Sequence, residues 1–362
     1  MQIQVKVAVV LGTRPEIIKM SPVIRALEKA NADFFILHSG QHYSYQMDRV
    51  FFEQLRLPGV KYNLEIGSGS HATQTARTLV GVESVLIKES PDVVLVEGDT
   101  NTVLAGALAA SKLHIQVGHV EAGLRSYDRR MPEEVNRVLI DHCSDYLFAP
   151  TGNAKTILLG EGLAEESIYV TGNTIVDAVY ENLQIASDRA SILGRLGLNS
   201  RGYFLVTLHR QENVDEPARF SSIVEGFERL ATHFNLPVIY PIHPRSRKRM
   251  SEFNIELRNL RLIDPTDFLD FLQLEKNARL LLTDSGGVQE ESCILGVPCV
   301  TLRDNTERPE TIHVGSNILA GTSPNTILEC AIEMLGRTDS WANPFGDGRA
   351  ADRILGTILG IA

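Results

Sequence analysis

The stretch Leu-Thr-Asp-Ser-Gly-Gly-Val-Gln-Glu-Glu, residues 282–291, joins an apolar run to a helical pattern through one serine and two glycines. The apolar run predicts a buried strand, and Ser285 followed by Gly286 and Gly287 predicts a tight turn into a helix. Backbone N–H groups at a helix N-terminus attract anions, and glycines let a phosphate approach them closely. A plain turn would explain the two glycines, but not the serine, the glycines and the glutamates of this stretch together. We therefore interpret this stretch as a site for a nucleotide-sugar diphosphate.

The same order of strand and helix repeats along the chain. The predicted strands are residues 5–11, 34–38, 92–96, 115–120, 145–149, 167–170, 203–208, 237–241, 260–263, 279–283 and 298–300. The predicted helices include residues 15–29, 101–112, 132–143, 217–233, 285–295 and the amphipathic tail 349–362. Continuous apolar strands are typical of parallel sheets with helices on both faces. The pattern predicts an α/β fold of two Rossmann-like, doubly wound domains.

Composition limits the class of protein. The chain has 362 residues and a formal net charge of −10, which predicts about two domains and argues against a general nucleic-acid binder. We expect no membrane span, because no apolar run approaches the length that one needs, and the N-terminus lacks a signal-peptide layout. The cysteines are widely spaced, so we expect thiols in a cytoplasmic protein rather than disulfides or a metal site.

We place the domain boundary near Gly172–Asn173, where the strand-rich order restarts after a long helical segment. The predicted N-terminal domain, with the acid–base residues, is 1–172. The predicted C-terminal domain, which binds the nucleotide, is 173–345, and residues 346–362 form the last helix.

Ligands of open parallel sheets bind beyond the carboxyl ends of the strands, so the polar tips of the strands are candidate site residues. In the first tip, residues 11–16, Gly12 allows a turn and Pro15 suits the first turn of a helix. Arg14 and Lys19 then lie near the helix N-terminus, where they could hold an anion. A solvated turn with two ordinary surface cations explains this tip equally well.

Three acidic residues follow within 35 residues of one another. Asp99 and Glu121 come directly after neighbouring predicted strands, and Glu133 begins a helix on which Arg137 shares its face. Such residues are commonly helix caps or surface turns. Carboxylates crowded together raise one another's pKa, which suits general acid and base catalysis.

The second half carries its own polar tips. His209 and Arg210 follow one predicted strand, and His243 follows the next. One such histidine is more often structural, but two at equivalent strand ends favour a ligand-binding face. Glu291 could accept hydrogen bonds from sugar hydroxyls, and Arg308 adds a cation near residues 285–287.

Taken in order, these motifs resemble the non-hydrolysing UDP-N-acetylglucosamine 2-epimerases. The motifs run from residue 12 to residue 310 and comprise residues 12–16, 40–42, 97–100, 119–125, 132–137, 209–213, 284–291 and 306–310. Each is weak alone, but eight in order are specific. The resemblance implies a glycosyltransferase-B-like architecture whose two domains face each other across a cleft that holds a UDP-sugar. It also implies a C-terminal helix that packs back on the first domain.

The resemblance implies inversion at C2 of UDP-N-acetylglucosamine, giving UDP-N-acetylmannosamine for surface polysaccharide or glycan synthesis. UDP leaves by anti elimination to give 2-acetamidoglucal, and then adds back with protonation from the opposite face. The implied catalytic residues are Asp99, Glu121, Glu133 and His209, and the implied substrate-binding residues are Arg14, Lys19, Arg137, Ser285, Gly286, Gly287, Glu291 and Arg308. No cofactor and no metal are implied, and a homodimer is expected.

Some relatives bind a second, activating UDP-N-acetylglucosamine through residues that match Gln41, Arg210 and His243. The segments 43–48 and 67–72 depart from the pattern of the family, which argues against such activation here. Alternative interpretations are a C2 epimerase of a modified UDP-sugar, such as a diacetamido-uronic or 6-deoxy sugar, a UDP-sugar-dependent glycosyltransferase, and a non-catalytic UDP-sugar sensor.

Overall fold

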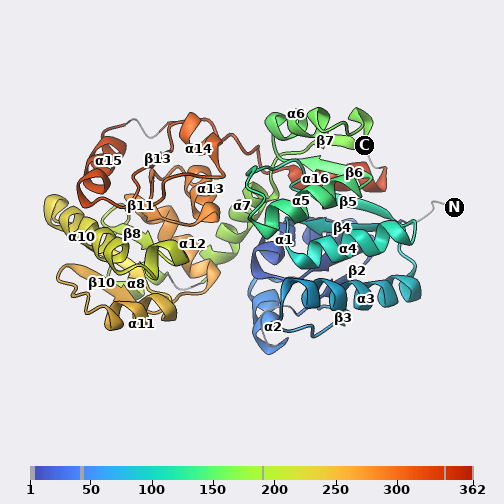
Figure 1. The fold of residues 1–362 in the computed structure, drawn as a ribbon, viewed down its shortest axis with the longest axis horizontal. Helices are drawn as coiled ribbons and strands as arrows, with labels where there is room; N and C mark the ends of the chain where they lie inside the picture. The colour runs from blue at the N-terminus through green and yellow to red at the C-terminus, as the bar shows by residue number, and fades with distance from the viewer. Residues whose placement is uncertain (1–4, 41–44, 190, 338–339, 361–362) are drawn as a thin grey trace. The chain divides into compact units, whose positions relative to one another are not determined.

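The computed structural model describes residues 5–40, 45–189, 191–337 and 340–360 (Figure 1). The chain divides into two compact units. The first unit is Met1–Glu181 together with Phe345–Ala362, and the second unit is Asn182–Pro344.

The first unit is built on a seven-stranded parallel sheet in the order β3-β2-β1-β4-β5-β6-β7. Its strands are β1 (Lys6–Leu11), β2 (Asp33–His38), β3 (Tyr62–Asn63), β4 (Val93–Glu97), β5 (Gln116–Val120), β6 (Tyr146–Ala149) and β7 (Ile168–Val170). Its helices are α1 (Arg14–Lys29), α2 (Tyr45–Gln54), α3 (His71–Glu89), α4 (Asn101–Lys112), α5 (Pro132–His142), α6 (Gly152–Gly160), the 3-10 turn η1 (Glu165–Ser167) and α16 (Ala350–Leu359), while α7 (Thr174–Ser187) leads into the second unit.

Helices cover both faces of the first sheet, because its strands carry apolar side chains on both faces. Ala8 and Val10 of β1 pack into one buried cluster with side chains of α3, α4 and α5, and the alternate residues Val7 and Val9 are equally buried. The C-terminal helix α16 packs on α1, and the backbone N–H of Ala351 donates to Asp177 at 2.9 Å.

The second unit is built on a six-stranded parallel sheet in the order β10-β9-β8-β11-β12-β13. Its strands are β8 (Phe204–Thr207), β9 (Val238–Pro241), β10 (Leu260–Ile263), β11 (Leu280–Thr283), β12 (Cys299–Thr301) and β13 (Asn317–Leu319). Its helices are α8 (Ile192–Leu196), α9 (Gln211–Val214), α10 (Pro217–Phe234), α11 (Pro244–Glu252), α12 (Phe268–Asn277), α13 (Gly286–Ile294), α14 (Pro309–His313) and α15 (Pro324–Gly336).

Both faces of the second sheet are also buried. Phe204 and Val206 of β8 pack with α10, α11 and α15, whereas Leu205 packs with α8, α12 and α13. The α/β fold with two parallel sheets that we predicted is therefore confirmed. We did not predict β3 and β13, which have two and three residues.

The strand order reverses once in each sheet, and these reversals position the candidate site. In the first sheet the chain proceeds outward from β1 to β2 and β3 and then returns to β4 on the other side. In the second sheet the equivalent neighbours are β8 and β11. Ligands of open α/β sheets bind beyond the carboxyl ends of the strands at such points. The tips of β1, β4 and β5, and those of β8 and β11, are therefore the places to examine.

Candidate active site

The tip of β1 is tightly packed around Gly12. A Cβ atom built on Gly12 would collide with the side chains of Thr102 and Ser39, so only glycine fits there. The buried carboxylate of Glu16, on α1, accepts hydrogen bonds from the Gly12 N–H at 2.6 Å and the Thr13 hydroxyl at 2.8 Å. Burial raises the pKa of Glu16 to about 7, against the effect of these hydrogen bonds. The turn thus holds a carboxyl that can be neutral near neutral pH.

Arg14 and Lys19 both lie on α1 next to this tip. The Arg14 guanidinium lies over the Phe51 ring at 5.7 Å. The Lys19 ammonium forms ion pairs with Glu121, and with Glu97 at 3.3 Å. Lys19 therefore joins α1 to the tips of β4 and β5 within the first unit.

Glu121 directly follows β5 in an unusual backbone conformation. Its φ of 70° lies in the left-handed region, which a glutamate adopts only when its surroundings hold it there. Its carboxylate is nearly buried and accepts a hydrogen bond from Asn173 Nδ2 at 3.3 Å as well as from Lys19. Strained residues cluster at functional sites, so this geometry supports Glu121 as an acid–base candidate.

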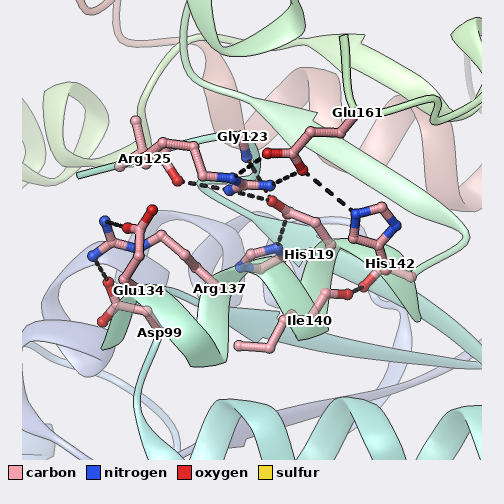
Figure 2. Close-up of polar contacts among 12 residues, drawn as sticks. Asp99, His119, Gly123, Arg125, Glu134, Arg137, Ile140, His142 and Glu161 are labelled. Atoms are coloured by element: carbon pink, nitrogen blue, oxygen red, sulfur yellow. Dashed lines mark hydrogen bonds and ion pairs between the residues drawn. The ribbon is translucent and has the colours of Figure 1, made fainter. Parts of the chain in front are cut away.

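Asp99 lies at the tip of β4 and is held from α5. Arg137 Nη2 donates to its carboxylate at 2.5 Å, and Asn136 Nδ2 donates to its backbone carbonyl at 2.9 Å. The other Arg137 terminal nitrogen pairs with Glu134 at 2.9 Å, as Figure 2 shows. Arg137 is therefore engaged by carboxylates on both sides.

The other ion pair of Arg137 is with Glu134, the residue next to the predicted acid–base residue Glu133. Glu134 also accepts hydrogen bonds from Ser126 and from the Tyr127 N–H, so it fixes the segment after β5. Burial would raise the pKa of Glu134, but these bonds and Arg137 lower it below its ordinary value. Glu133 is half-buried.

A buried network of polar side chains contacts the tips of β4 and β5 (Figure 2). His119 Nδ1 lies 2.6 Å from the Asp141 carboxylate, and its Nε2 lies 2.8 Å from the Gly98 carbonyl oxygen next to Asp99. Asp141 also accepts from the Gly123 N–H at 3.2 Å and pairs with Arg125 at 2.7 Å. Burial would raise the pKa of Asp141, but His119 and Arg125 hold it below its ordinary value. This charged network fixes the two strand tips relative to each other.

In the second unit, Asp284 organises the tips of β8 and β11. Its fully buried carboxylate accepts hydrogen bonds from the backbone N–H groups of His209 at 3.1 Å and Arg210 at 2.9 Å, and from Asn213 Nδ2 at 3.2 Å. His209 Nδ1 lies 3.2 Å from the same carboxylate, while half of the His209 side chain remains exposed. Burial would raise the pKa of Asp284, but His209 and the other donors outweigh it and lower the pKa.

Helix α13 begins at Gly286 with Ser285 as its N-cap residue. A Cβ atom built on Gly286 or Gly287 would meet no atom closer than 3.9 Å, so the space at this helix start is open to a ligand. Further along α13, Glu290 pairs with Arg308 Nε at 2.7 Å, and Glu291 is nearly buried. The arrangement fits an anion at the start of α13 with Arg308 held close to the same helix.

The residues proposed for activation lie in different settings. Gln41 is outside the described residues. Arg210 is 3.6 Å from Glu212 and 3.7 Å from Glu307. His243 caps α11 by accepting from the Arg245 N–H at 3.2 Å, and burial lowers its pKa, with further lowering by the charges of His209 and Arg245.

Other classes of site can be checked over the described ranges. Within residues 5–40, 45–189, 191–337 and 340–360, no group of three or more His, Cys, Asp and Glu side chains could hold a metal ion. Of the helices in these ranges, none is long and apolar enough to cross a membrane. All four cysteines are unpaired thiols, and Cys143 is the one that is not fully buried.

Two parallel sheets, with acidic strand tips in one unit and an open Gly-Gly helix start in the other, make this an α/β protein whose solved structural neighbours have a glycosyltransferase-B-like fold. The family model described as UDP-N-acetylglucosamine 2-epimerase matches residues 25–359. A relative of that name from Methanocaldococcus jannaschii is 56% identical over 359 residues, which cover 97% of this chain and 98% of the relative. A relative from Methanococcus maripaludis, also named UDP-N-acetylglucosamine 2-epimerase, is 54% identical and covers 98% of both chains. The chain belongs to the UDP-N-acetylglucosamine 2-epimerase family.

Solved structures agree with this assignment. The Methanocaldococcus jannaschii UDP-GlcNAc 2-epimerase in complex with UDP-GlcNAc and UDP has a TM-score of 0.88 and 56% identity, and the match covers 99% of this chain and all of the other. The Neisseria meningitidis enzyme bound to UDP-GlcNAc has a TM-score of 0.88 at 34% identity, covering 98% of this chain and all of the other.

Sequence reasoning missed Glu97, His119, Asp141 and Asp284 as site residues. Asp141 contacts His119, which lies 22 residues away in the sequence, so no local pattern reveals it. Asp284 directly follows the predicted strand 279–283, so it left the signal of a strand tip. Glu97 did leave a signal, because it is a carboxylate at the end of the apolar run Val93–Val96.

Proposed function

We propose that this protein interconverts UDP-N-acetylglucosamine and UDP-N-acetylmannosamine. The observation that carries the proposal is the acid–base arrangement at the tips of β4 and β5, in a chain 56% identical to an enzyme solved with UDP-GlcNAc and UDP. The C2 proton is not adjacent to a carbonyl group, so it cannot be removed by simple enolisation. Elimination solves this problem, because the pair of electrons left by the C2 proton forms a double bond as the C1–O bond to UDP breaks.

In the proposed reaction, a carboxylate removes the C2 proton while UDP departs, giving 2-acetamidoglucal and UDP. UDP then adds back at C1, and an acid protonates C2 from the opposite face. Asp99, Glu121 and Glu133 are the proposed acid–base residues. Asp99 and Glu121 are each bound to a cation, Arg137 and Lys19 respectively, which stabilises the charged form of a base between turnovers.

Residues that are proposed to bind the diphosphate are present in each of the two units. In the first unit they are the cations Arg14, Lys19 and Arg137. In the second, the start of α13 with Ser285, Gly286 and Gly287 offers N–H donors to a phosphate, and Arg308 adds charge. His209 is the proposed aid to the departing diphosphate, because its ring is exposed on one side and held by Asp284 on the other. Glu291 is proposed to accept hydrogen bonds from the sugar hydroxyls.

The direct test is incubation of the purified chain with UDP-N-acetylglucosamine alone, with products separated and identified by NMR. We expect UDP-N-acetylmannosamine to accumulate to a constant ratio, together with traces of 2-acetamidoglucal and free UDP. A relative 42% identical to this chain is named UDP-2,3-diacetamido-2,3-dideoxy-D-glucuronate 2-epimerase, so that sugar belongs in the same assay. Turnover of the diacetamido sugar with none of UDP-N-acetylglucosamine would contradict the proposal.

We also propose that the enzyme is a cytoplasmic homodimer. Unpaired thiols fit a reducing compartment, and Val80 and Ile87 on α3 are 63% and 62% exposed, which fits an apolar surface covered by a second copy. Light scattering on the full chain should give twice the mass of one chain. A single-chain mass at micromolar concentration would contradict the dimer.

A further inference from the structure

Lys19 holds two carboxylates at once. Its ammonium contacts Glu121 and lies 3.3 Å from Glu97 Oε1, and the side chains of Lys19, Glu97 and Glu121 are 14%, 2% and 7% exposed. Glu97 is the last residue of β4 and Glu121 follows the neighbouring strand β5, so the sheet itself brings the two carboxylates to one cation.

The charges around Glu97 do not balance when every group is ionised. Lys19 and Glu16 face it from α1, and Glu121 faces it from the end of β5. Three carboxylates and one ammonium would leave two uncompensated negative charges in a nearly dry site, which is costly. Burial raises the pKa of Glu97 well above its ordinary value, Lys19 opposes this, and the charges of Glu121 and Glu16 add to it. The surroundings therefore favour the protonated form of Glu97.

We propose that Glu97 is a positioning residue that competes with Glu121 for Lys19 and so sets how tightly Glu121 holds its proton. The proposal deepens the proposed function, because it rests on the acid–base role of Glu121. When Glu97 is neutral, Lys19 is available to the Glu121 carboxylate. When Glu97 loses its proton, it attracts Lys19 and repels the charge on Glu121, so Glu121 becomes the stronger base. Two carboxyls coupled in this way titrate as a pair rather than as separate groups.

The test is the pH dependence of kcat/KM for the wild type, Glu97→Asp and Glu97→Gln. Glutamine cannot lose a proton, so the profile of Glu97→Gln should keep the step that reports Glu121 with Lys19 available to it and lose the second step at higher pH, where Glu97 ionises. Aspartate keeps an ionisable carboxyl but withdraws it from Lys19 by one methylene, so both steps should remain with weaker coupling between them. This difference also allows the proposal to be tested with Glu97→Asp if Glu97→Gln fails to fold.

The control is Glu28→Gln, which removes one exposed charge from the same helix that carries Lys19. Its profile should superimpose on that of the wild type. If the profile of Glu97→Gln keeps both steps of the wild type, the coupling is absent and the proposal is overturned. A purely structural role for Glu97 predicts this result, with lower stability and an unchanged profile.

A second measurement does not depend on turnover. Carbon-13 labelling of the glutamate side chains lets each carboxyl be titrated by NMR in the full chain. The wild type should show two coupled steps for Glu97 and Glu121, and Glu97→Gln should show only the step of Glu121, with no further change at the higher pH where Glu97 ionises. A Glu121 titration that is unchanged by Glu97→Gln overturns the proposal. A wild type that shows the coupled steps but never epimerises contradicts the proposed function and leaves the coupling standing.

Discussion

The buried carboxylate of Asp284 holds the backbone and the ring of His209 at the tip of β8, and replacing Asp284 with asparagine tests whether catalysis needs this support. The carboxylate accepts from two backbone N–H groups, from Asn213 Nδ2 and from the His209 ring, all at 2.9–3.2 Å. Asparagine has nearly the same shape but offers one acceptor oxygen and one NH₂ group. Because Asn213 and both backbone groups are donors, whichever side the NH₂ group takes faces a donor.

The magnitude follows from the bonds that are lost. A hydrogen bond to a charged group contributes about 1.5–3 kcal/mol, and a buried donor left without an acceptor costs about 1–3 kcal/mol. Counting one lost charge-assisted bond to His209 and a partly compensated backbone donor gives about 2–4 kcal/mol of lost transition-state stabilisation. At about 1.36 kcal/mol per tenfold change, kcat/KM should fall by roughly 30- to 900-fold.

The assay is the initial rate of epimerisation with UDP affinity measured by calorimetry on the same samples. Asp264→Asn is the matched control, because its carboxylate is 93% exposed and its single pairing is with Arg247. We expect that control to stay within about twofold of the wild type, since exposed ion pairs contribute little. A folded Asp284→Asn variant with kcat/KM within about threefold of the wild type would refute the idea that Asp284 holds His209 in place.

Two further predictions concern stability. Gly12→Ala should lower the free energy of unfolding, measured by urea titration, by about 1–3 kcal/mol, because the new methyl group collides with Thr102. The control is Gly59→Ala, where a Cβ meets no atom within 4 Å, and it should change the free energy of unfolding by less than about 0.5 kcal/mol. Equal effects of the two substitutions would contradict the packing argument. Burial and the neighbouring Glu291 raise the pKa of Glu275 well above its ordinary value, so the stability it contributes is present in acid and is lost as pH rises toward the raised pKa. Glu275→Gln should therefore flatten the loss of stability between pH 5 and pH 8, and parallel curves for the two proteins would show that Glu275 does not titrate there.

Most of the sheet could be predicted from the sequence because its strands are buried on both faces. Such strands appear in the sequence as continuous apolar runs. The helices between them could also be located, and α4 was predicted at its observed bounds of Asn101–Lys112. Strand β3 has two residues, Tyr62 and Asn63, and pairs with the last two residues of β2. So short a strand has no periodicity to detect.

Candidate site residues could be selected from the sequence because strand tips can be located once the strands are known. Asp99 and Glu121 were selected in this way, and in the structure both are bound to cations. The sequence could not show that Glu134 rather than Glu133 pairs with Arg137, because i,i+3 and i,i+4 neighbours lie on nearly the same helix face. It also could not show that Lys19 serves two carboxylates, because that contact depends on three segments meeting in space.

Exchange of the C2 proton with solvent tests the central claim most directly. The chain is incubated with UDP-N-acetylglucosamine in heavy water, and the sugars are recovered and examined by NMR and mass spectrometry. The proposed elimination removes the C2 proton and returns one drawn from solvent, so deuterium should appear at C2 of UDP-N-acetylmannosamine, and of recovered UDP-N-acetylglucosamine, as equilibrium is approached. Conversion without deuterium at C2, or no exchange and no conversion in a folded protein that binds UDP, would contradict the account.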